Sequence, residues 1–417
     1  MNLYFLGFAV LIVTSIALPM DFTALHGNTL NAVVPFAAMI CCLWCLELLV
    51  LRRVSKFDAY RVSLAVLLFI LIAFLSFAVG QYPWFLSPRA PIGAQIAGLG
   101  LMVLSGGLFL VAGHRIRHIH HLRWLTWIFL GVGGLFCILQ IIPAIGILTR
   151  LSSPASVGSI FWICLVAISF SQALFNRDLS WTARALCISI TLLSLYRGLF
   201  QTTSWVSGWL PPIVAIVVII LFRIPRTLAG IGFLSIPVGF YLAGRIINKL
   251  MTGEEYSWIT RTEAWRVLWQ IFERNPIIGL GPANYYHYTL QFPILGWYVN
   301  FSSHNNYIDL LMQTGILGLL AFCWFLFEII RLILNLLRFK AIGEFERAFL
   351  IGVLGSISGA IVSGMLADWI IPFYYNIGLR GFRSSCLFWL FLGGVLALKR
   401  IIDQRSAIAA VPLPNAG

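Results

Sequence analysis

The sequence predicts an all-α integral membrane protein that crosses the bilayer many times, and three observations carry this prediction. Of the 417 residues, 60% are hydrophobic and only 10% are charged, and the mean hydropathy is +0.94. A soluble protein carries charge on roughly a quarter of its residues. The apolar residues also gather into runs of about 20, the length that a helix needs to cross a hydrocarbon core about 30 Å thick. These features exclude a soluble globular protein and a disordered chain.

About twelve apolar runs are long enough to be considered as membrane-spanning helices. They lie near residues 3–20, 29–51, 62–80, 91–113, 122–142, 155–175, 182–196, 209–222, 227–247, 306–337, 348–368 and 384–398. The chain is therefore expected to divide into four parts. Residues 1–247 hold helices one to nine, 248–303 form a long loop with amphipathic helices, 304–400 hold helices ten to twelve, and 401–417 form a tail.

Positive residues indicate the orientation, because Lys and Arg in short loops are retained on the cytoplasmic side of the membrane. Clusters such as Arg52 and Arg53, and later Arg115 and Arg117, fall in every second loop. This pattern places both chain ends in the cytoplasm and the loop 248–303 outside. The net charge of +14 does not indicate a nucleic-acid partner, because the 28 Lys and Arg residues are scattered between apolar runs.

The long outer loop contains a predicted amphipathic helix that ends at Asn275 and Pro276. At 100° per residue, one face collects an aromatic and aliphatic stripe. The stripe consists of Trp258, Trp265, Leu268, Trp269 and Phe272. This helix is expected to lie along the membrane surface. Arg261 projects from the stripe and needs an anionic partner such as a lipid phosphate, although an arginine that only touches phospholipid headgroups fits the same pattern.

His304 stands directly before the tenth apolar run, at the outer membrane boundary. An imidazole with an ordinary pKa of about 6.5 can accept a proton at neutral pH, so His304 is a candidate general base. A structural role at the boundary is the alternative. Asp309, one helical turn further on, is expected to orient a neighbouring polar group or to make an interhelical hydrogen bond.

Several segments together resemble the O-antigen ligase and polymerase superfamily of bacterial cell-surface glycan assembly. They are YRG at 196–198, RTEAW at 261–265, NPIIGLGPANY at 275–285 and HNNYIDLLMQTGILGLLAF at 304–322. The arrangement of about twelve helices with one long loop between the ninth and tenth is similar to that family as well. One departure is Gln313, where the family commonly has a carboxylate, so no acidic role is carried to that position.

The resemblance implies a membrane glycosyltransferase of the GT-C-like type in the bacterial inner membrane. Its periplasmic site would transfer a glycan from undecaprenyl diphosphate to a sugar of the lipid A core oligosaccharide. Under this reading Arg197, Arg261 and Arg266 hold the diphosphate, and His304 activates or orients the acceptor hydroxyl. No cofactor is expected. A metal is not expected either, since the sequence has no Asp-X-Asp triplet to hold a divalent ion.

Further outer residues are candidates for substrate binding because they oppose the positive-inside trend or flank His304. They are Arg89, Arg245, Lys249, Asn305, Arg380 and Arg383. Each cation taken singly can instead anchor a lipid headgroup. Asp368, beside Trp369, is a weaker candidate for binding sugar hydroxyls.

Three rival functions remain open at this point. A polysaccharide polymerase would use the same donor with a second lipid-linked glycan as acceptor, and a protein O-oligosaccharyltransferase would transfer the glycan to a polypeptide. A lipid-linked glycan transporter would also be an apolar helical bundle. Such a transporter should show internal repeats and helices interrupted near the bilayer midplane, and the sequence indicates neither.

Overall fold

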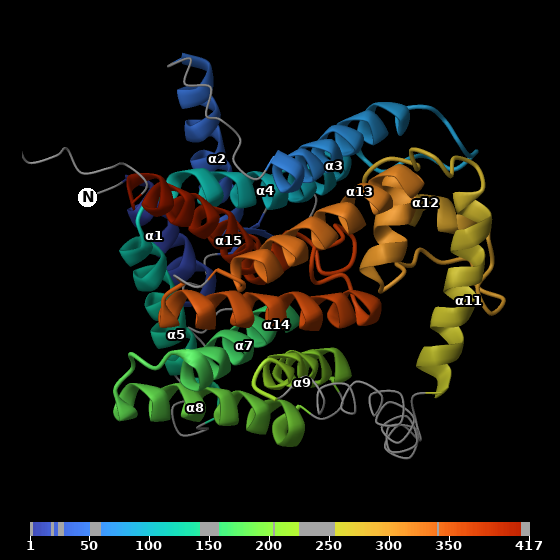
Figure 1. Ribbon diagram of the computed structural model, residues 1–417. Coiled ribbons are helices and arrows are strands. Elements are labelled where there is room, and N and C mark those ends of the chain that lie inside the picture. The colour runs from blue at the N-terminus through green and yellow to red at the C-terminus, as the bar shows by residue number, and fades with distance from the viewer. Residues whose placement is uncertain are drawn as a thin grey trace, which may run out of the picture.

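The computed structural model shows long helices bundled side by side, with a small group of loops and short helices at one end (Figure 1). The structure describes residues 3–17, 21–23, 29–50, 60–141, 158–202, 205–224, 255–339 and 342–409. The expected ninth helix at 227–247 therefore lies outside the described residues. Each of the other expected apolar runs forms a helix.

The first half of the chain contributes helices that follow the apolar runs closely. They are α1 (Leu3–Ala17), α2 (Val33–Val50), α3 (Tyr60–Val79), α4 (Ile92–Arg115), α5 (Ile119–Ile141), α7 (Ser159–Phe175), α8 (Trp181–Tyr196) with the π-helical turn η4 (Arg197–Gln201), and α9 (Val206–Leu221). The second half contributes the remaining elements. They are α11 (Glu255–Phe272), α12 (Tyr285–Tyr288), η5 (Thr289–Gln291), α13 (Asn306–Leu336), α14 (Glu344–Leu366), η6 (Leu379–Gly381) and α15 (Phe382–Ala409).

The protein is a multi-pass membrane protein. Among the described residues, 8 helices are long and apolar enough to cross a membrane, and α1, α7 and α9 are shorter apolar helices. The outer faces of the bundle are apolar too: on α3, Leu71 is 54% exposed and Phe74 is 50% exposed. Side chains of this kind need a lipid environment, because water would penalise so broad an apolar surface.

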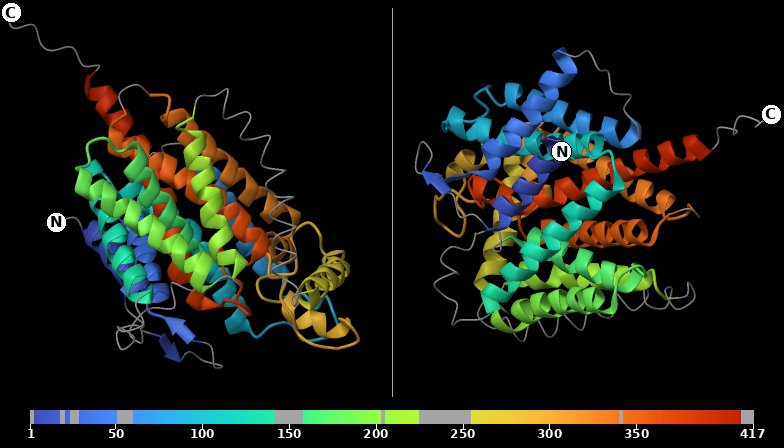
Figure 2. Two further views of the ribbon diagram at one scale, coloured as in Figure 1. Left: turned by 90° about the horizontal axis from the view of Figure 1, so that it is seen from below. Right: turned by 90° about the vertical axis from the view of Figure 1, so that its left-hand side faces the viewer.

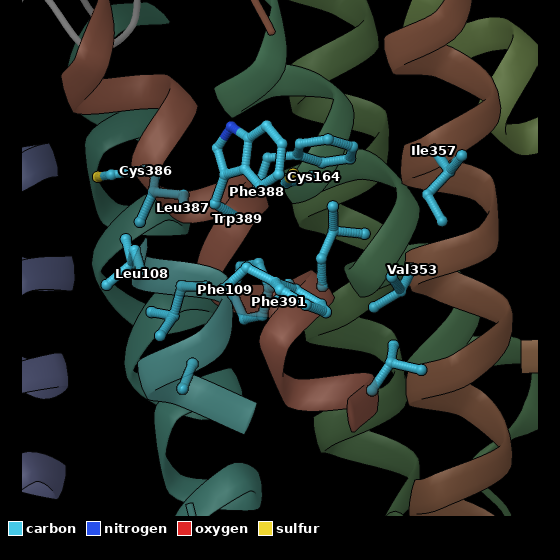
Figure 3. Close-up of a cluster of buried hydrophobic side chains, with 14 of the residues drawn as sticks. Leu108, Phe109, Cys164, Val353, Ile357, Cys386, Leu387, Phe388, Trp389 and Phe391 are labelled. Atoms are coloured by element: carbon cyan, nitrogen blue, oxygen red, sulfur yellow. The ribbon is translucent and has the colours of Figure 1, made fainter. Parts of the chain in front are cut away.

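The interior of the bundle is filled where α4, α7, α14 and α15 meet (Figure 3). Phe109 from α4 and Trp389 from α15 are fully buried there. A side chain on Gly393 would come within 2.6 Å of the Phe109 carbonyl oxygen. The glycine therefore lets α15 and α4 approach closely, which is how helices pack tightly inside membranes.

A short β-hairpin lies between the first two helices and is a local addition to the predicted all-α fold. β1 (Asp21–Thr23) pairs antiparallel with β2 (Thr29–Asn31), with Phe22 opposite Leu30. The Asn31 side chain accepts a hydrogen bond from Val33 N at 2.9 Å and so begins α2. The sequence prediction overlooked the hairpin because the apolar runs were extended into the connection between them.

Helix α13 is interrupted at Gly315, which has φ 66° and ψ −171°. No interrupted helix was expected from the sequence, and this expectation was wrong. The loop that follows α11 enters the break and completes its hydrogen bonds. Leu280 N and Gly281 N donate to the carbonyls of Met312 and Gln313 at 2.9 and 3.1 Å, and Ile316 N donates to the Pro276 carbonyl at 2.8 Å. In an apolar medium these bonds are required, since no water can replace them.

The same loop is fastened to α3 and to the segment before α4. Asn284 is fully buried, donates to the Gly80 carbonyl at 3.0 Å and accepts from Ala90 N at 3.1 Å. A side chain on Gly80 would come within 2.7 Å of Gly281 Cα, so both positions need glycine. Gln313 accepts from Ala283 N at 3.1 Å. The signature NPIIGLGPANY thus builds a rigid junction between α3, α4 and α13.

Helix α11 runs across the end of the bundle, at the end opposite to the C-terminal end of α15 (Figures 1 and 2). Its predicted position along the membrane surface stays a prediction. Within the predicted stripe Trp269 is 57% exposed, and Val267 and Ile271, which lie outside the stripe, are buried. Leu268 and Phe272 do face the protein, and the Trp258 side chain lies outside the described ones.

Replacement of Gly315 by alanine should destabilise the protein. An alanine would have to adopt a backbone conformation reserved for glycine, and its Cβ would meet the Ile277 carbonyl oxygen at 2.2 Å. Such strain costs on the order of 3 kcal/mol. The unfolding temperature in detergent measures the effect. Gly131→Ala in α5 is the matched control, because a Cβ there meets nothing within 4 Å. Equal stability of the two variants would contradict the role assigned to the break.

Candidate active site

His304 lies at the start of α13, where a backbone turn presents its side chain to the outside. Its φ of 50° is positive, and the residue is exposed. Asn305 follows as the N-cap and accepts from Tyr307 N and Ile308 N at 3.0 and 3.2 Å. The Asn305 amide also donates to the Met365 carbonyl at 3.1 Å, which ties α13 to α14. His304 is therefore held at the N-terminal end of a long helix, where negative charge is favoured.

A chain of hydrogen bonds leads from His304 into the protein. The Asn376 amide nitrogen lies 3.1 Å from His304 Nδ1 and also donates to Asp368 Oδ1. Asp368 is fully buried, and its other oxygen accepts from Phe373 N at 2.7 Å. Burial raises the pKa of the Asp368 carboxyl to about 6. The histidine is thus anchored through an asparagine to a buried carboxylate, an arrangement that fixes its ring.

Arg261 lies beside this histidine. Four residues further along α11, the Trp265 indole donates to the Ser303 carbonyl at 2.9 Å, which docks the helix next to His304. Partial desolvation of its ring lowers the pKa of His304, and the positive charge of Arg261 lowers that pKa further. Both causes disfavour the imidazolium form, so His304 is neutral at pH 7. A neutral imidazole and a guanidinium together make a site for an anionic group.

A second buried carboxylate stands behind the histidine. Asp309 accepts hydrogen bonds from the Tyr285 hydroxyl and, at 2.7 Å, from the Ser303 hydroxyl. The Phe373 ring stacks on Tyr285 with ring centroids 4.7 Å apart. Burial and the neighbouring Asp309 raise the pKa of Tyr285 well above its ordinary value, so the phenol keeps its proton. The predicted orienting role of Asp309 agrees with these contacts, which shape the segment that carries His304.

Arg197 occupies a neighbouring pocket between α7, α8 and α9. Its guanidinium lies over the Trp162 ring, 4.6 Å from the centroid. Trp205 and Trp209 line the same pocket. Trp205 meets Trp369, the residue after Asp368, with ring centroids 6.1 Å apart. The pocket therefore adjoins the segment that anchors His304, while the contact made by Arg197 itself is aromatic.

For the other predicted site residues among the described ones, the structure shows contacts with residues other than His304. Arg266 is exposed on α11 and lies 3.8 Å from Glu263. Arg89 is exposed and donates to the Gln81 carbonyl, and Arg380 is exposed on η6. Arg383 is fully buried, and its guanidinium donates to the Thr14 carbonyl at 3.4 Å. Arg245 and Lys249 lie outside the described residues.

Two residues of the hydrogen-bond chain that reaches His304 were not singled out from the sequence for that role. Asn376 was given no role, and Asp368 was treated only as a weak candidate for sugar hydroxyls. An acidic residue at the end of an apolar run is the signal that could have raised the rank of Asp368, because a carboxylate there is costly to bury. Asn376 carries no signal, since a single asparagine in a loop is common.

The fold and the site define a membrane protein with a cationic and imidazole-bearing site at one end of a helical bundle. Residues 189–323 match the family model described as O-antigen ligase. The matched segment contains Arg197, Arg261, His304 and Asp309. The resemblance to the O-antigen ligase superfamily is therefore confirmed. No curated protein matches the chain.

The effect of the Arg261 charge on the pKa of His304 should be measurable. In the wild type the imidazole should titrate below its ordinary pKa of about 6.5, because partial desolvation and a neighbouring cation both lower the pKa. Arg261→Gln removes one of these causes, so the pKa should rise while staying below the ordinary value. Histidine titration by NMR on labelled protein checks this, with Arg274→Gln at the end of α11 as the control. A His304 pKa unchanged by Arg261→Gln would place Arg261 too far away to act.

Proposed function

We propose that this protein is an O-antigen ligase that transfers a glycan from undecaprenyl diphosphate to a sugar of the lipid A core oligosaccharide. The observation that carries the proposal is the docking of α11 on Ser303 through Trp265, which brings Arg261 near enough to His304 to lower the pKa of the imidazole. Arg261 and His304 lie in the segment that matches the family. Arg261 and Arg197 hold the donor diphosphate, with Arg266 at its edge. The exposed cations Arg89 and Arg380, with Arg245, Lys249 and Asn305, are proposed contacts for the remaining substrate groups, whereas the burial of Arg383 removes it from this set.

The helix α11 offers a route for a lipid-linked donor to reach this pairing. It lies across the end of the bundle, with Trp269 exposed and Arg261 half-buried. Tryptophan is favoured at the level of lipid headgroups, where its ring is apolar and its N–H polar. A diphosphate carried on an isoprenoid chain would sit at the same depth. The guanidinium can then form the paired hydrogen bonds to phosphate oxygens for which its planar geometry is suited.

The proposed reaction depends mainly on stabilisation of the negative charge that develops on the leaving diphosphate. The acceptor hydroxyl oxygen forms a bond to the anomeric carbon, and the bond from that carbon to the phosphate oxygen breaks. The electron pair passes to the diphosphate, so negative charge grows beside Arg261. Fixed donors in a poorly hydrated site stabilise such charge strongly. His304 acts on the same groups, either by accepting the hydroxyl proton or by donating a hydrogen bond.

The proposed location is the bacterial inner membrane, with both termini in the cytoplasm and the site on the periplasmic face. The distribution of Lys and Arg supports this orientation. Arg115 and Arg405, which the orientation assigns to the cytoplasmic side, are paired with Glu47 and, at 2.6 Å, with Glu346. The proposed reaction and location imply three partners: the lipid-linked glycan, the lipid A core and membrane lipid.

The lipopolysaccharide pattern of a deletion strain tests the proposal. A ligase deletion should lose all core-linked glycan and accumulate polymer on undecaprenyl diphosphate. Expression of the wild type or of Arg274→Gln should restore the pattern. Arg261→Ala should fail to restore it, and Arg261→Lys should restore it in part, because a point charge cannot replace the paired hydrogen bonds of a guanidinium.

Two other patterns would contradict the ligase proposal. Core that carries a single repeat unit would identify a polymerase, since ligation would then still occur. Glycan trapped in the cytoplasmic leaflet would identify a transporter. Protein levels of each variant in the membrane serve as the control for folding.

Transfer by the purified protein should not depend on a divalent cation. The proposed site supplies its positive charge through arginine, so a metal ion is not needed to neutralise the diphosphate. The rate with purified donor and acceptor should persist after exhaustive treatment with EDTA. Loss of activity that magnesium or manganese restores would contradict the arginine site.

A further inference from the structure

The contacts of Asn376 decide which nitrogen of His304 carries the proton. The Asn376 amide nitrogen is shared between Asp368 Oδ1 and His304 Nδ1, the latter at 3.1 Å. An amide nitrogen has two hydrogens and can donate to both. It cannot accept a hydrogen bond from Nδ1. The Nδ1 atom must therefore be the acceptor of this pair.

Asp368 holds the amide in this orientation. The carboxylate receives two N–H donors, one from Asn376 and one from Phe373 N at 2.7 Å. Two donors of this kind favour the ionised carboxylate, which has no proton to give. If the Asn376 amide were turned over, its oxygen would face the carboxylate oxygen, and two acceptors would oppose each other without a hydrogen. At neutral pH the amide nitrogen therefore stays directed at both partners.

We propose that Asp368 and Asn376 are positioning residues that hold neutral His304 in the tautomer with its proton on Nε2. In this tautomer His304 presents an N–H to the substrate and acts as a hydrogen-bond donor rather than as a general base. The assignment of this role rests on the proposed ligase function, whereas the tautomer itself does not. Together with Arg261, the histidine then forms a site made only of donors, which fits the oxygens of a diphosphate.

The transfer step balances without transfer of a proton to the histidine. The acceptor oxygen bonds to the anomeric carbon as the diphosphate leaves with the electron pair of the broken bond. The hydroxyl proton is lost to water once the new bond has formed. Glycosyl transfer through a cation-like transition state tolerates this late loss. The Nε2–H and Arg261 stabilise the departing diphosphate, so the rate gain comes from charge stabilisation.

The first experiment reads the tautomer directly on the full-length protein in lipid nanodiscs, without substrate. Nitrogen NMR of labelled histidine distinguishes a protonated from an unprotonated ring nitrogen, and the His304 signal is identified by its loss in His304→Ala. The wild type should show Nε2 protonated. The double variant Asp368→Asn with Asn376→Asp reverses the donor and acceptor order and should move the proton to Nδ1. A wild-type ring protonated on Nδ1 would overturn the tautomer.

The second experiment compares two replacements of His304 in the transfer assay. Glutamine keeps an N–H near the place of Nε2 but cannot act as a base, whereas alanine keeps neither. His304→Ala should lose about 10²- to 10³-fold in rate, as for loss of one donor to a developing negative charge. His304→Gln should recover at least about tenfold of that loss. A His304→Gln variant that is folded, by its unfolding temperature, and as inactive as His304→Ala would overturn the donor role.

The two measurements can distinguish failure of the proposed tautomer from failure of the proposed ligase function. If the wild type shows the Nε2 proton but transfers no glycan, the ligase proposal fails and the tautomer stands. If transfer is active and the proton lies on Nδ1, the ligase proposal stands and the positioning role of Asp368 and Asn376 fails.

Discussion

The exchange of backbone hydrogen bonds at the break in α13 is the constraint on which the rest of this structure depends. A helix interrupted inside an apolar bundle leaves N–H and carbonyl groups unpaired, and each costs several kcal/mol without a partner. The loop around Leu280 supplies those partners with its own backbone. The loop in turn fixes α12 and the segment up to His304. The backbone hydrogen bonds at the break therefore help to place the segment that carries the site.

Much of the architecture follows from composition alone, because apolar runs in lipid have few alternatives to the helix. The break at Gly315 could not be foreseen, since glycine is common in membrane helices and only its φ of 66° distinguishes it. The sequence also could not tell which part of the apolar surface of α11 meets the protein. The helical period groups Trp269 with Leu268 and Phe272, but Trp269 is exposed, where its amphipathic ring is stable.

The candidate site was accessible to sequence reasoning only in part. Arg261 and His304 stand out because a cation in an aromatic stripe and a histidine at a helix boundary are unusual. Their closeness follows from the docking of Trp265 on Ser303, which no local pattern encodes. Asn376 lies 72 residues from His304 in sequence. A hydrogen bond across such a distance depends on the whole packing of α13, α14 and η6, so it had to be seen in three dimensions.

The contacts of Asn284 set an order on the biogenesis of the protein. This side chain joins the Gly80 carbonyl and Ala90 N to the loop after α11, across 204 and 194 residues of sequence respectively. Helices α3 and α4 are synthesised long before Asn284 emerges from the ribosome, so their junction stays incomplete until then. During that interval the Gly80 carbonyl and Ala90 N lack the partner that they have in the folded protein. Helices α3 and α4 therefore complete their packing only after the later half of the polypeptide has been synthesised.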